Sequence, residues 1–381
     1  MSEVANIPQL RFSEFSGEWE EKKLGELCKF TQGVQIPFSE QLTKYKEGAI
    51  RYLYIRDFFT DDFPYYVKDQ YPNKVIHTDE IMMVNTGNTA GKAFMGATGV
   101  LSNNAFKVSF DKTKVSNIFL FQRITSDTIQ RRIKSFFNAG GQPHLGHKNI
   151  AIIPMGFASL KEQQKIAAFL TTVDSKIEQL SKKQELLKEY KKGLMQQIFS
   201  QATRFKADDG CDFPDWEEKK LGDVSVRGTS NISANQLEDN NGDYKIYGAA
   251  GHLKNIDFYT EEDCYVAIVK DGAGVGRIML LESKTSVLGT LAIIKAKQGN
   301  DINFLYWLIQ TINFRKYVVG STIPHIYYRD YQAEKLRIPS LSEQTKIANF
   351  LSFIDSKIEQ VGKQLDESKQ FKKALLQQMF V

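Results

Sequence analysis

The chain contains two long segments that are nearly copies of each other. The segment that starts at Ser159, SLKEQQKIAAFLTTVDSKIEQLSKKQELLKEYKKGLMQQIFS, returns from Ser340 as SLSEQTKIANFLSFIDSKIEQVGKQLDESKQFKKALLQQMFV, with more than half of the positions identical. A shorter pair precedes each half, WEEKKLGEL from Trp19 and WEEKKLGDV from Trp216. Repeats of this length indicate one structural unit built twice. We expect two globular domains, each followed by the same long element, at residues 1–158, 159–200, 201–339 and 340–381.

The repeated segment has the heptad pattern of a coiled coil, with apolar residues at the first and fourth positions. This seam comprises Ile166, Leu170, Val173, Ile177, Leu180 and Leu187 in the first copy and Ile347, Leu351, Ile354, Ile358, Val361 and Leu365 in the second. Because a whole domain separates the copies, we expect them to pair as an antiparallel coiled coil; two independent surface helices are the alternative. Lys191 and Lys372 interrupt the seam, which suggests register marks or a face for another protein.

Each long helix has a start signal, and the regions between the helices are mixed in pattern. Ser159 to Glu162 and Ser340 to Glu343 have the spacing of a capping box. Strand-like runs cover 50–55, 80–84, 106–110, 264–269 and 291–296, and helix-like runs cover 118–137 and 302–317. The expected fold class is therefore α+β, with a pseudo-twofold internal repeat.

Several motifs resemble catalytic signatures but fit them poorly. Asp62-Phe63-Pro64-Tyr65 lacks a proline of the methyltransferase loop, and Gly272 to Gly276 lacks the spacing of a nucleotide-binding turn. Gly87 to Gly91 aligns with that second stretch, so a strand connection used twice is the better interpretation. Glu217-Glu218-Lys219 is only a loose nuclease match, and His144 and His147 lack a third metal ligand. We therefore expect no catalysis and no metal site in this chain.

The bulk properties limit the setting of the protein. Its three cysteines are isolated, which predicts free thiols in a reducing cytoplasm rather than a disulfide framework. No secretory signal or membrane span is expected. The net charge is only +5, and residues 201–339 are acidic overall, so binding to DNA should be weak and salt-sensitive until partners add contacts.

Both halves carry loops with side chains suited to DNA. The segments Asn138–Lys148 and Gly320–Arg329 combine glycine or aromatic residues with residue types that read bases or bind phosphates. A backbone nest beside each repeated glycine turn would add phosphate contacts. The candidate DNA-binding residues are Lys92, Arg131, Arg132, Gln142, His144, His147 and Lys148 in the first half, and Lys270, Arg277, Arg315, Lys316, His325, Tyr327, Tyr328 and Arg329 in the second. For each residue the alternative is an ordinary surface position.

Taken together, the layout resembles the specificity subunit of type I restriction-modification enzymes. The segments EQQKIAAFL, EQTKIANFL and the repeated DSKIEQ are its most specific marks, and the resemblance covers the whole chain. It implies two target recognition domains, each of which reads half of a split, asymmetric site in double-stranded DNA. It also implies helices that space the domains and dock two modification (methyltransferase) subunits, joined by restriction (motor-nuclease) subunits. S-adenosylmethionine, ATP and Mg²⁺ then belong to the partners, and this chain has no cofactor.

The expected dimensions agree with this function. A helix of about 40 residues is roughly 60 Å long, and half-sites on one face of DNA lie about 34 Å apart. Two alternatives belong to other classes. One is a scaffold whose coiled coil binds a protein without any DNA role. The other is a single-chain enzyme, which the missing motifs disfavour.

Overall fold

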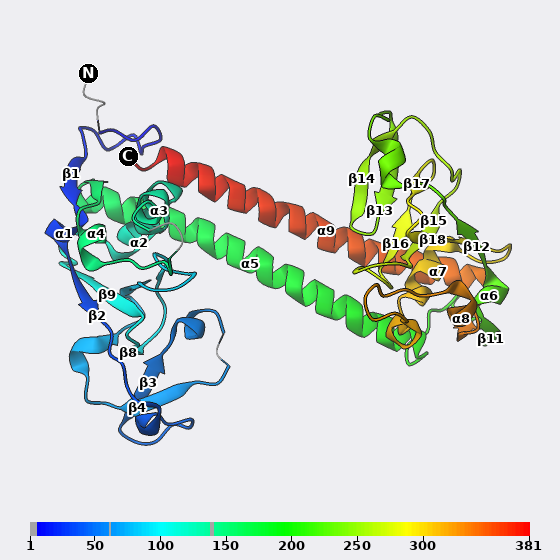
Figure 1. Ribbon diagram of the computed structural model, residues 1–381, viewed down its shortest axis with the longest axis horizontal. Helices are drawn as coiled ribbons and strands as arrows, with labels where there is room; N and C mark the ends of the chain where they lie inside the picture. Colours follow the sequence, from blue (N-terminus) through cyan, green and yellow to red (C-terminus); the bar gives the residue numbers. More distant parts are fainter. Residues whose placement is uncertain (1–5, 61, 138–140) are drawn as a thin grey trace. The chain divides into compact units, whose positions relative to one another are not determined.

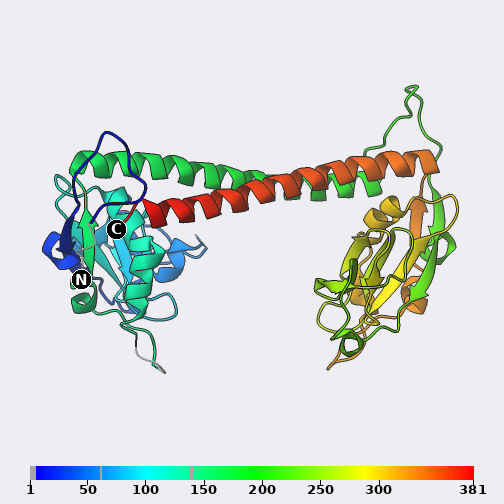
Figure 2. The same ribbon diagram turned by 90° about the horizontal axis from the view of Figure 1, so that it is seen from above.

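The computed structural model describes residues 6–60, 62–137 and 141–381 of the protein (Figures 1 and 2). It divides into two compact units. Unit 1 comprises Met1–Ser181 with Lys363–Val381, and unit 2 comprises Lys182–Gly362. The two repeated segments form the long helices α5 (Leu160–Phe199) and α9 (Leu341–Gln378). Each unit therefore contains a globular region together with one end of each long helix. Within the described part of the chain, no helix is long and apolar enough to span a membrane.

The main sheet has the same strand order in both units. In unit 1 the order is β2-β9-β6-β7, formed by β2 (Cys28–Gln32), β9 (Ala105–Phe110), β6 (Ile81–Val84) and β7 (Ala93–Phe94). In unit 2 the order is β12-β18-β15-β16, formed by β12 (Ser225–Thr229), β18 (Leu291–Ala296), β15 (Tyr265–Val269) and β16 (Ile278–Leu281). All pairings are antiparallel. Every residue of β6 and β15 is buried, which explains their unbroken apolar runs.

The repeated tryptophan segments also form equivalent structures. In unit 1, β1 (Glu20–Lys23) pairs with β10 (Pro154–Phe157), and in unit 2, β11 (Glu217–Lys220) pairs with β19 (Lys335–Ile338). The parts of the sequence that differ between the two halves form different second sheets. Unit 1 has β4 (Tyr65–Lys68), β3 (Ala49–Leu53), β8 (Gly99–Leu101) and β5 (Val75–Ile76) in that order, and unit 2 has β14 (Gly251–Ile256), β13 (Tyr244–Gly248) and β17 (Ser286–Val287).

Three predicted elements are shorter than expected. The run 118–137 is not one helix but α2 (Asn117–Thr125) and α3 (Asp127–Lys134), because Ser126 between them is extended, with ψ 147°. The run 302–317 contains α7 (Ile302–Ile309) and a 3₁₀ turn over Phe314–Tyr317. The strand expected over 50–55 ends at Leu53, since Ile55–Phe58 forms another 3₁₀ turn. Short helices are α1 (Leu24–Leu27), α4 (His147–Ala151), α6 (Leu221–Val224) and α8 (Tyr328–Tyr331).

The ends of the long helices belong to the cores of the globular regions. Ile166, Leu170, Leu375 and Met379 lie in the core of unit 1. In the same way, Ile198, Ile347 and Leu351 lie in the core of unit 2. All twelve predicted seam residues are buried except Val173, Ile177, Leu187 and Ile358, which are half-buried. Burial of this stripe supplies the main hydrophobic free energy that holds each helix end to its unit.

The lysines that interrupt the seam have partners inside their own units. Lys372 Nζ lies 2.6 Å from Asp174 Oδ1 in unit 1. The equivalent Lys191 Nζ lies 2.5 Å from Asp355 Oδ1 in unit 2. Both aspartates are the first residue of the repeated DSKIEQ motif. A charged pair at a seam position penalises shifted alignments, because a shift would leave both charges half-buried and unpaired. This geometry favours the register-mark interpretation of the two lysines.

Only half of each predicted capping box is present. Ser159 Oγ accepts a hydrogen bond from the Glu162 backbone N–H, and Ser340 Oγ accepts one from that of Glu343, each at 3.4 Å. The reciprocal bonds were predicted wrongly, because both carboxylates are occupied elsewhere. In unit 1, Glu162 accepts from Arg11 and Trp19, and in unit 2, Glu343 accepts from Arg204 and Trp216. We refer to these two groups as the Arg–Trp–Glu clusters.

Candidate nucleic-acid interface

A glycine turn follows the central strand of the main sheet in both units. In unit 1 it connects β6 to β7, and Gly87 and Gly91 have φ of 92° and 84°. In unit 2 it connects β15 to β16, and Gly272 and Gly276 have φ of 90° and 83°. Such left-handed values favour glycine. The interpretation of these residues as one strand connection used twice is confirmed.

Each turn is hydrogen-bonded to the Pro-His segment of the same unit. The N–H of Gly87 donates to the Pro143 carbonyl, and that of Gly272 donates to the Pro324 carbonyl, both at 2.9 Å. Two further bonds repeat the pattern, from Leu145 N–H to Asn85 O at 2.7 Å and from Ile326 N–H to Lys270 O at 2.9 Å. Segments about 55 residues apart in the sequence thus form one composite surface in each unit. We call it the turn–loop surface.

In unit 1 the turn–loop surface presents four of the predicted residues to solvent. Lys92, Gln142, His144 and Lys148 are exposed. His144 Nδ1 lies 3.0 Å from Thr86 Oγ1, which couples the loop to the turn. Lys92 Nζ lies 5.7 Å from the centre of the Phe59 ring, a cation–π contact. Residues 138–140 of the predicted segment lie outside the described residues.

Other predicted residues of unit 1 lie on α3 or turn inward. Arg131 and Arg132 are exposed on α3, where Arg132 donates to the Pro154 carbonyl at 3.1 Å. His147 starts α4 and is half-buried, with its ring centre 4.8 Å from that of Phe106 and 5.9 Å from that of Phe30. Its environment is therefore mainly aromatic.

In unit 2 the same surface is richer in aromatic and basic side chains. The His325 and Tyr327 rings are in edge contact at 4.9 Å, and the Arg329 guanidinium lies 4.8 Å from the centre of the Tyr327 ring. Lys270 starts the turn, and Arg277 ends it and donates to the Ala249 carbonyl at 2.6 Å. These side chains are exposed or half-exposed, so the surface is accessible to a ligand.

Three predicted residues of unit 2 differ in their surroundings. Tyr328 is half-buried against Tyr331, and its hydroxyl lies 3.3 Å from Ser225 Oγ. Lys316 is paired with Glu334 at 2.8 Å, so its charge is already compensated. Arg315, in the adjacent 3₁₀ turn, is exposed.

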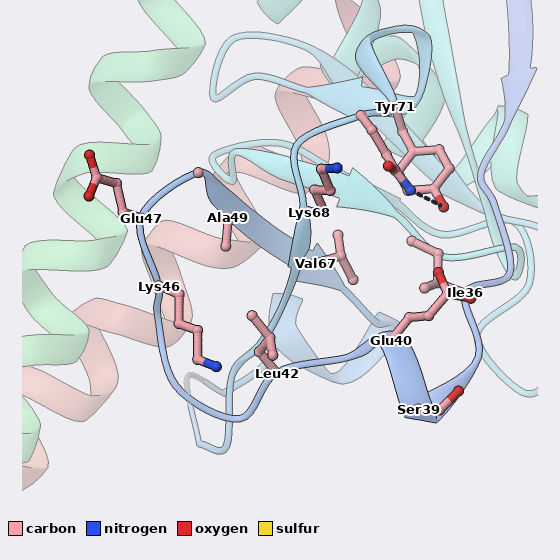
Figure 3. A pocket seen from close by; sticks show the side chains of 12 residues that line it. Ile36, Ser39, Glu40, Leu42, Lys46, Glu47, Ala49, Val67, Lys68 and Tyr71 are labelled. Carbon is pink, nitrogen blue, oxygen red and sulfur yellow. Dashed lines mark hydrogen bonds between the residues drawn. The ribbon is translucent and has the colours of Figure 1, made fainter.

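A further cavity lies away from these residues, beside the second sheet of unit 1 (Figure 3). Its volume is about 690 Å³. Figure 3 shows Val67 and Lys68 on one strand, with Lys46 and Glu47 on the loop beside Ala49. None of the predicted DNA-binding residues lines it, and its charges are of both signs.

Sequence reasoning missed two groups of residues. Arg11 and Arg204 each precede a phenylalanine, and this repeated pair would have indicated the Arg–Trp–Glu clusters. Arg227 on β12 lines a cavity beside the turn–loop surface of unit 2. No local motif marks it, because the pairing of β12 with β18 brings it there.

Acidification is expected to destabilise unit 1 through His147. Burial, with a smaller effect from His144, lowers the pKa of the His147 imidazole below its ordinary value of 6.5. Below that pH the unfolded chain binds a proton more readily than the folded chain, so the free energy of unfolding falls as pH falls. Above it both states are neutral and the contribution vanishes. Urea unfolding at about pH 8 and about pH 5.5 measures the difference. The His147→Phe variant should lose this part of the pH dependence, and an unchanged dependence would contradict the assignment.

Comparisons with known proteins agree with one another. The family model for the type I restriction modification DNA specificity domain matches residues 16–189 and 214–367. The type I restriction enzyme MjaVIII specificity subunit of Methanocaldococcus jannaschii is 25% identical over 404 residues, which cover 94% of this chain and 91% of that protein. The MjaIX specificity subunit of the same organism is 22% identical, over 72% of this chain and 71% of its own length.

Solved structures share the fold. The S subunit of a type I restriction-modification system from M. genitalium superposes with a TM-score of 0.69 at 15% identity, over 98% of this chain and 99% of that one. A chain from a structure of complex assembly and conformational transition in a type I R-M system has a TM-score of 0.53 at 17% identity, over 96% and 98% of the two chains. Because the family model covers most of this sequence in two segments, the protein belongs to the specificity subunits of type I restriction-modification systems.

Proposed function

We propose that each unit reads one half of a split, asymmetric site in double-stranded DNA through its turn–loop surface. The observation that carries this proposal is one hydrogen-bonded frame with two different sets of exposed side chains. Gln142 and Lys148 lie on the frame in unit 1, and Tyr327 and Arg329 lie on it in unit 2. Equal frames favour equal docking on DNA, and unequal side chains favour unequal base sequences.

In this proposal the chain selects the site and its partners carry out the reactions in the cytoplasm. Two modification subunits supply S-adenosylmethionine-dependent methylation of adenine, and restriction subunits supply ATP- and Mg²⁺-dependent movement and cleavage. The long helices would pair as an antiparallel coiled coil with pseudo-twofold symmetry and set the spacing of the half-sites. The contacts of α5 with α9 inside each unit, including Lys372–Asp174 and Lys191–Asp355, support this arrangement.

A repeated groove supports the docking of one methyltransferase subunit on each unit. In unit 2 the groove has a volume of about 440 Å³ and lies between the last turns of α5 and the end of α7. In unit 1 it has a volume of about 300 Å³ and lies between the last turns of α9 and the end of α2. The helix residues that line both grooves are equivalent in the repeat: Lys188, Lys191, Lys192, Met195 and Gln196 in unit 2, and Lys369, Lys372, Lys373, Leu376 and Gln377 in unit 1. Lys191, Lys372 and Lys373 are paired with Asp355, Asp174 and Asp127, whereas the equivalent Lys188 and Lys369 remain available to acidic side chains of two copies of one partner.

Charge reversal in one groove is expected to remove one methyltransferase subunit. Lys188 and Lys369 are exposed and form no ion pair within the described ranges, so Lys188→Glu and Lys369→Glu should leave folding intact. Native mass spectrometry of the complex should show one bound methyltransferase subunit with either substitution and none with both. Lys176→Glu, an exposed position of α5 outside the groove, serves as the control. Two bound subunits in the double variant would contradict the docking assignment.

The DNA-reading role is tested by sequencing methylated bases in cells that carry this gene and its methyltransferase. A split, asymmetric methyladenine motif is expected, and it should vanish when this gene alone is deleted. Exchanging residues 201–339 for those of another specificity subunit should change one half of the motif only. Alanine at Gln142, His144 and Lys148 should alter the other half.

An unchanged methylome after deletion would favour a scaffold whose helices bind a partner without a DNA role. Methylation by the purified chain alone would instead favour a single-chain enzyme. A bound site that is one continuous palindrome would contradict the two-reader arrangement, because two different readers cannot read identical halves.

A further inference from the structure

One position of the shared sheet is filled in opposite ways in the two units. Phe30 on β2 lies opposite Val108, and its equivalent, Arg227 on β12, lies opposite Ile294. Two pairs further along, on the same face of the sheet, Phe106 lies opposite Gln32, whereas the equivalent Ala292 lies opposite Thr229. The frame is the same, but unit 2 has a cation and a small side chain where unit 1 has two phenyl rings.

In unit 1 aromatic rings occupy this space. Phe30 and Phe106 are in edge contact, with ring centres 5.8 Å apart and planes at 90°. The ring of His147 packs on both of them from the start of α4. Such a cluster is stabilised by burial and ring geometry. It offers no charged group to a ligand.

In unit 2 the equivalent space is a cavity of about 290 Å³. It lies between the strands of the main sheet, the start of the glycine turn and the loop that leads into α8. The side chains and backbone that line it belong to Arg227, Lys270, Asp271, Ala292, Ile326, Tyr327, Tyr328 and Arg329. Three of these residues are cations and one is an anion.

The positive charge of the cavity is only partly compensated, because Asp271 lines the cavity and Asp330 lies beside Arg329. Arg227 and Lys270 form no ion pair within the part of the chain that is described. Arg329 contacts its neighbour Asp330 at 3.5 Å and stacks on Tyr327. Arg227 and Arg329 are exposed and Lys270 is half-buried, so their like charges repel each other across a partly hydrated, concave surface that attracts anions. An anionic ligand that accepts hydrogen bonds would relieve this repulsion.

We propose that this cavity binds a phosphodiester group of the DNA backbone and that unit 1 lacks the equivalent contact. The inference rests on the proposed DNA-reading function and adds a binding site to it. A phosphodiester has one negative charge and two free acceptor oxygens, which suit the fork of a guanidinium and a nearby ammonium. A base edge presents hydrogen-bond donors as well as acceptors. The charged side chains that line the cavity are donors except for Asp271, so they fit the acceptor oxygens of a phosphate better than a base edge.

The test measures DNA affinity of the full chain with its methyltransferase subunits, on a duplex that carries the methylated motif and on one of unrelated sequence. Arg227→Gln and Lys270→Gln should each lower the affinity for both duplexes by about tenfold. Each should also lower the slope of log affinity against log salt by about 0.9. The exposed Arg337→Gln in β19 is the matched control of equal charge, and Lys148→Gln is the unit 1 equivalent of Arg329. Urea midpoints verify that all four variants are folded.

Methylphosphonate substitution then locates the contact. Each phosphate of the half-site read by unit 2 is replaced in turn by its neutral methylphosphonate. At one position the methylphosphonate should lower the DNA affinity of the wild-type complex, and at that same position it should not lower the affinity of the Arg227→Gln complex any further. The proposal is overturned if every substitution acts equally on both proteins, or if Arg227→Gln relaxes the preference for a single base pair without a change in slope. If the wild-type complex prefers no motif, the proposed function fails, while affinity for unrelated DNA still decides the phosphate contact.

Discussion

Replacement of Glu343 by alanine is expected to destabilise unit 2 by about 3–5 kcal/mol. The Glu343 side chain has no exposed surface and accepts hydrogen bonds from Arg204 at 2.9 Å and Trp216 Nε1 at 3.0 Å. Removal of the carboxylate leaves the indole N–H without this partner and the Arg204 cation with only the exposed Asp215, 3.5 Å away, and a poorly compensated charge near the core is costly. Urea unfolding followed by tryptophan fluorescence measures the loss, since Trp216 lies in the affected cluster.

Two variants make this test specific. Glu367→Ala removes an exposed glutamate from the same helix and should change the free energy of unfolding by less than about 0.5 kcal/mol. Glu162→Ala in unit 1 should match the effect of Glu343→Ala, because Glu162 accepts from Arg11 at 2.7 Å and from Trp19 at 3.2 Å. A loss below about 1 kcal/mol in both units would mean that water replaces the carboxylate at little cost.

Insertion of one heptad into both long helices is expected to change the spacer of the methylated motif and to leave both half-sites unchanged. Duplication of residues 182–188 and 363–369 keeps the apolar seam in phase. Seven residues add about 10.5 Å of helix, which corresponds to at most about three base pairs of DNA. The twist of the added base pairs decides which spacer length is accepted. Sequencing of methylated adenines reports the new motif directly.

An insertion in α9 alone is the control for this experiment. It would move Lys372 seven residues out of line with Asp174 or shift the other end of the seam, so methylation should be lost. A spacer that stays the same after the double insertion would contradict the spacing role of the helices. A changed half-site would show instead that the insertion had distorted a globular unit.

Much of the architecture could be predicted because its causes are local or repeated. Heptad spacing fixes which face of a helix is apolar, so the seam from Ile166 to Leu187 could be identified without knowledge of its partner. Glycines at equivalent places, such as Gly91 and Gly276, predicted a shared turn for the same reason. A Cβ on Gly91 would lie 2.5 Å from Ile133 Cγ2, and one on Gly276 would lie 3.0 Å from Phe314 Cβ, so close packing adds to the demand for glycine.

The candidate site was predicted only in outline. The turn and the Pro-His segment were recognised as repeated features, but their hydrogen bonding was not, since no spacing rule relates residues so far apart in the sequence. Tyr328 is of a residue type that can contact bases from an exposed position, yet its ring packs against Tyr331 because α8 turns it inward. The DNA-binding roles of all these residues stay predictions until the affinity and methylation experiments are done.

The sequence by itself determined the repeat, the two long helices and the family of the protein, because heptads and sequence repeats are patterns of consecutive residues. Tertiary structure alone decided which buried charges find partners and what fills each unit's sheet. Glu343 does not complete a capping box, because it accepts hydrogen bonds from Arg204 and Trp216, which belong to distant segments of the chain. Arg227 lines a cavity because its strand neighbour provides Ala292 instead of a phenyl ring. Desolvation and packing depend on neighbours in space, which only the folded chain brings together.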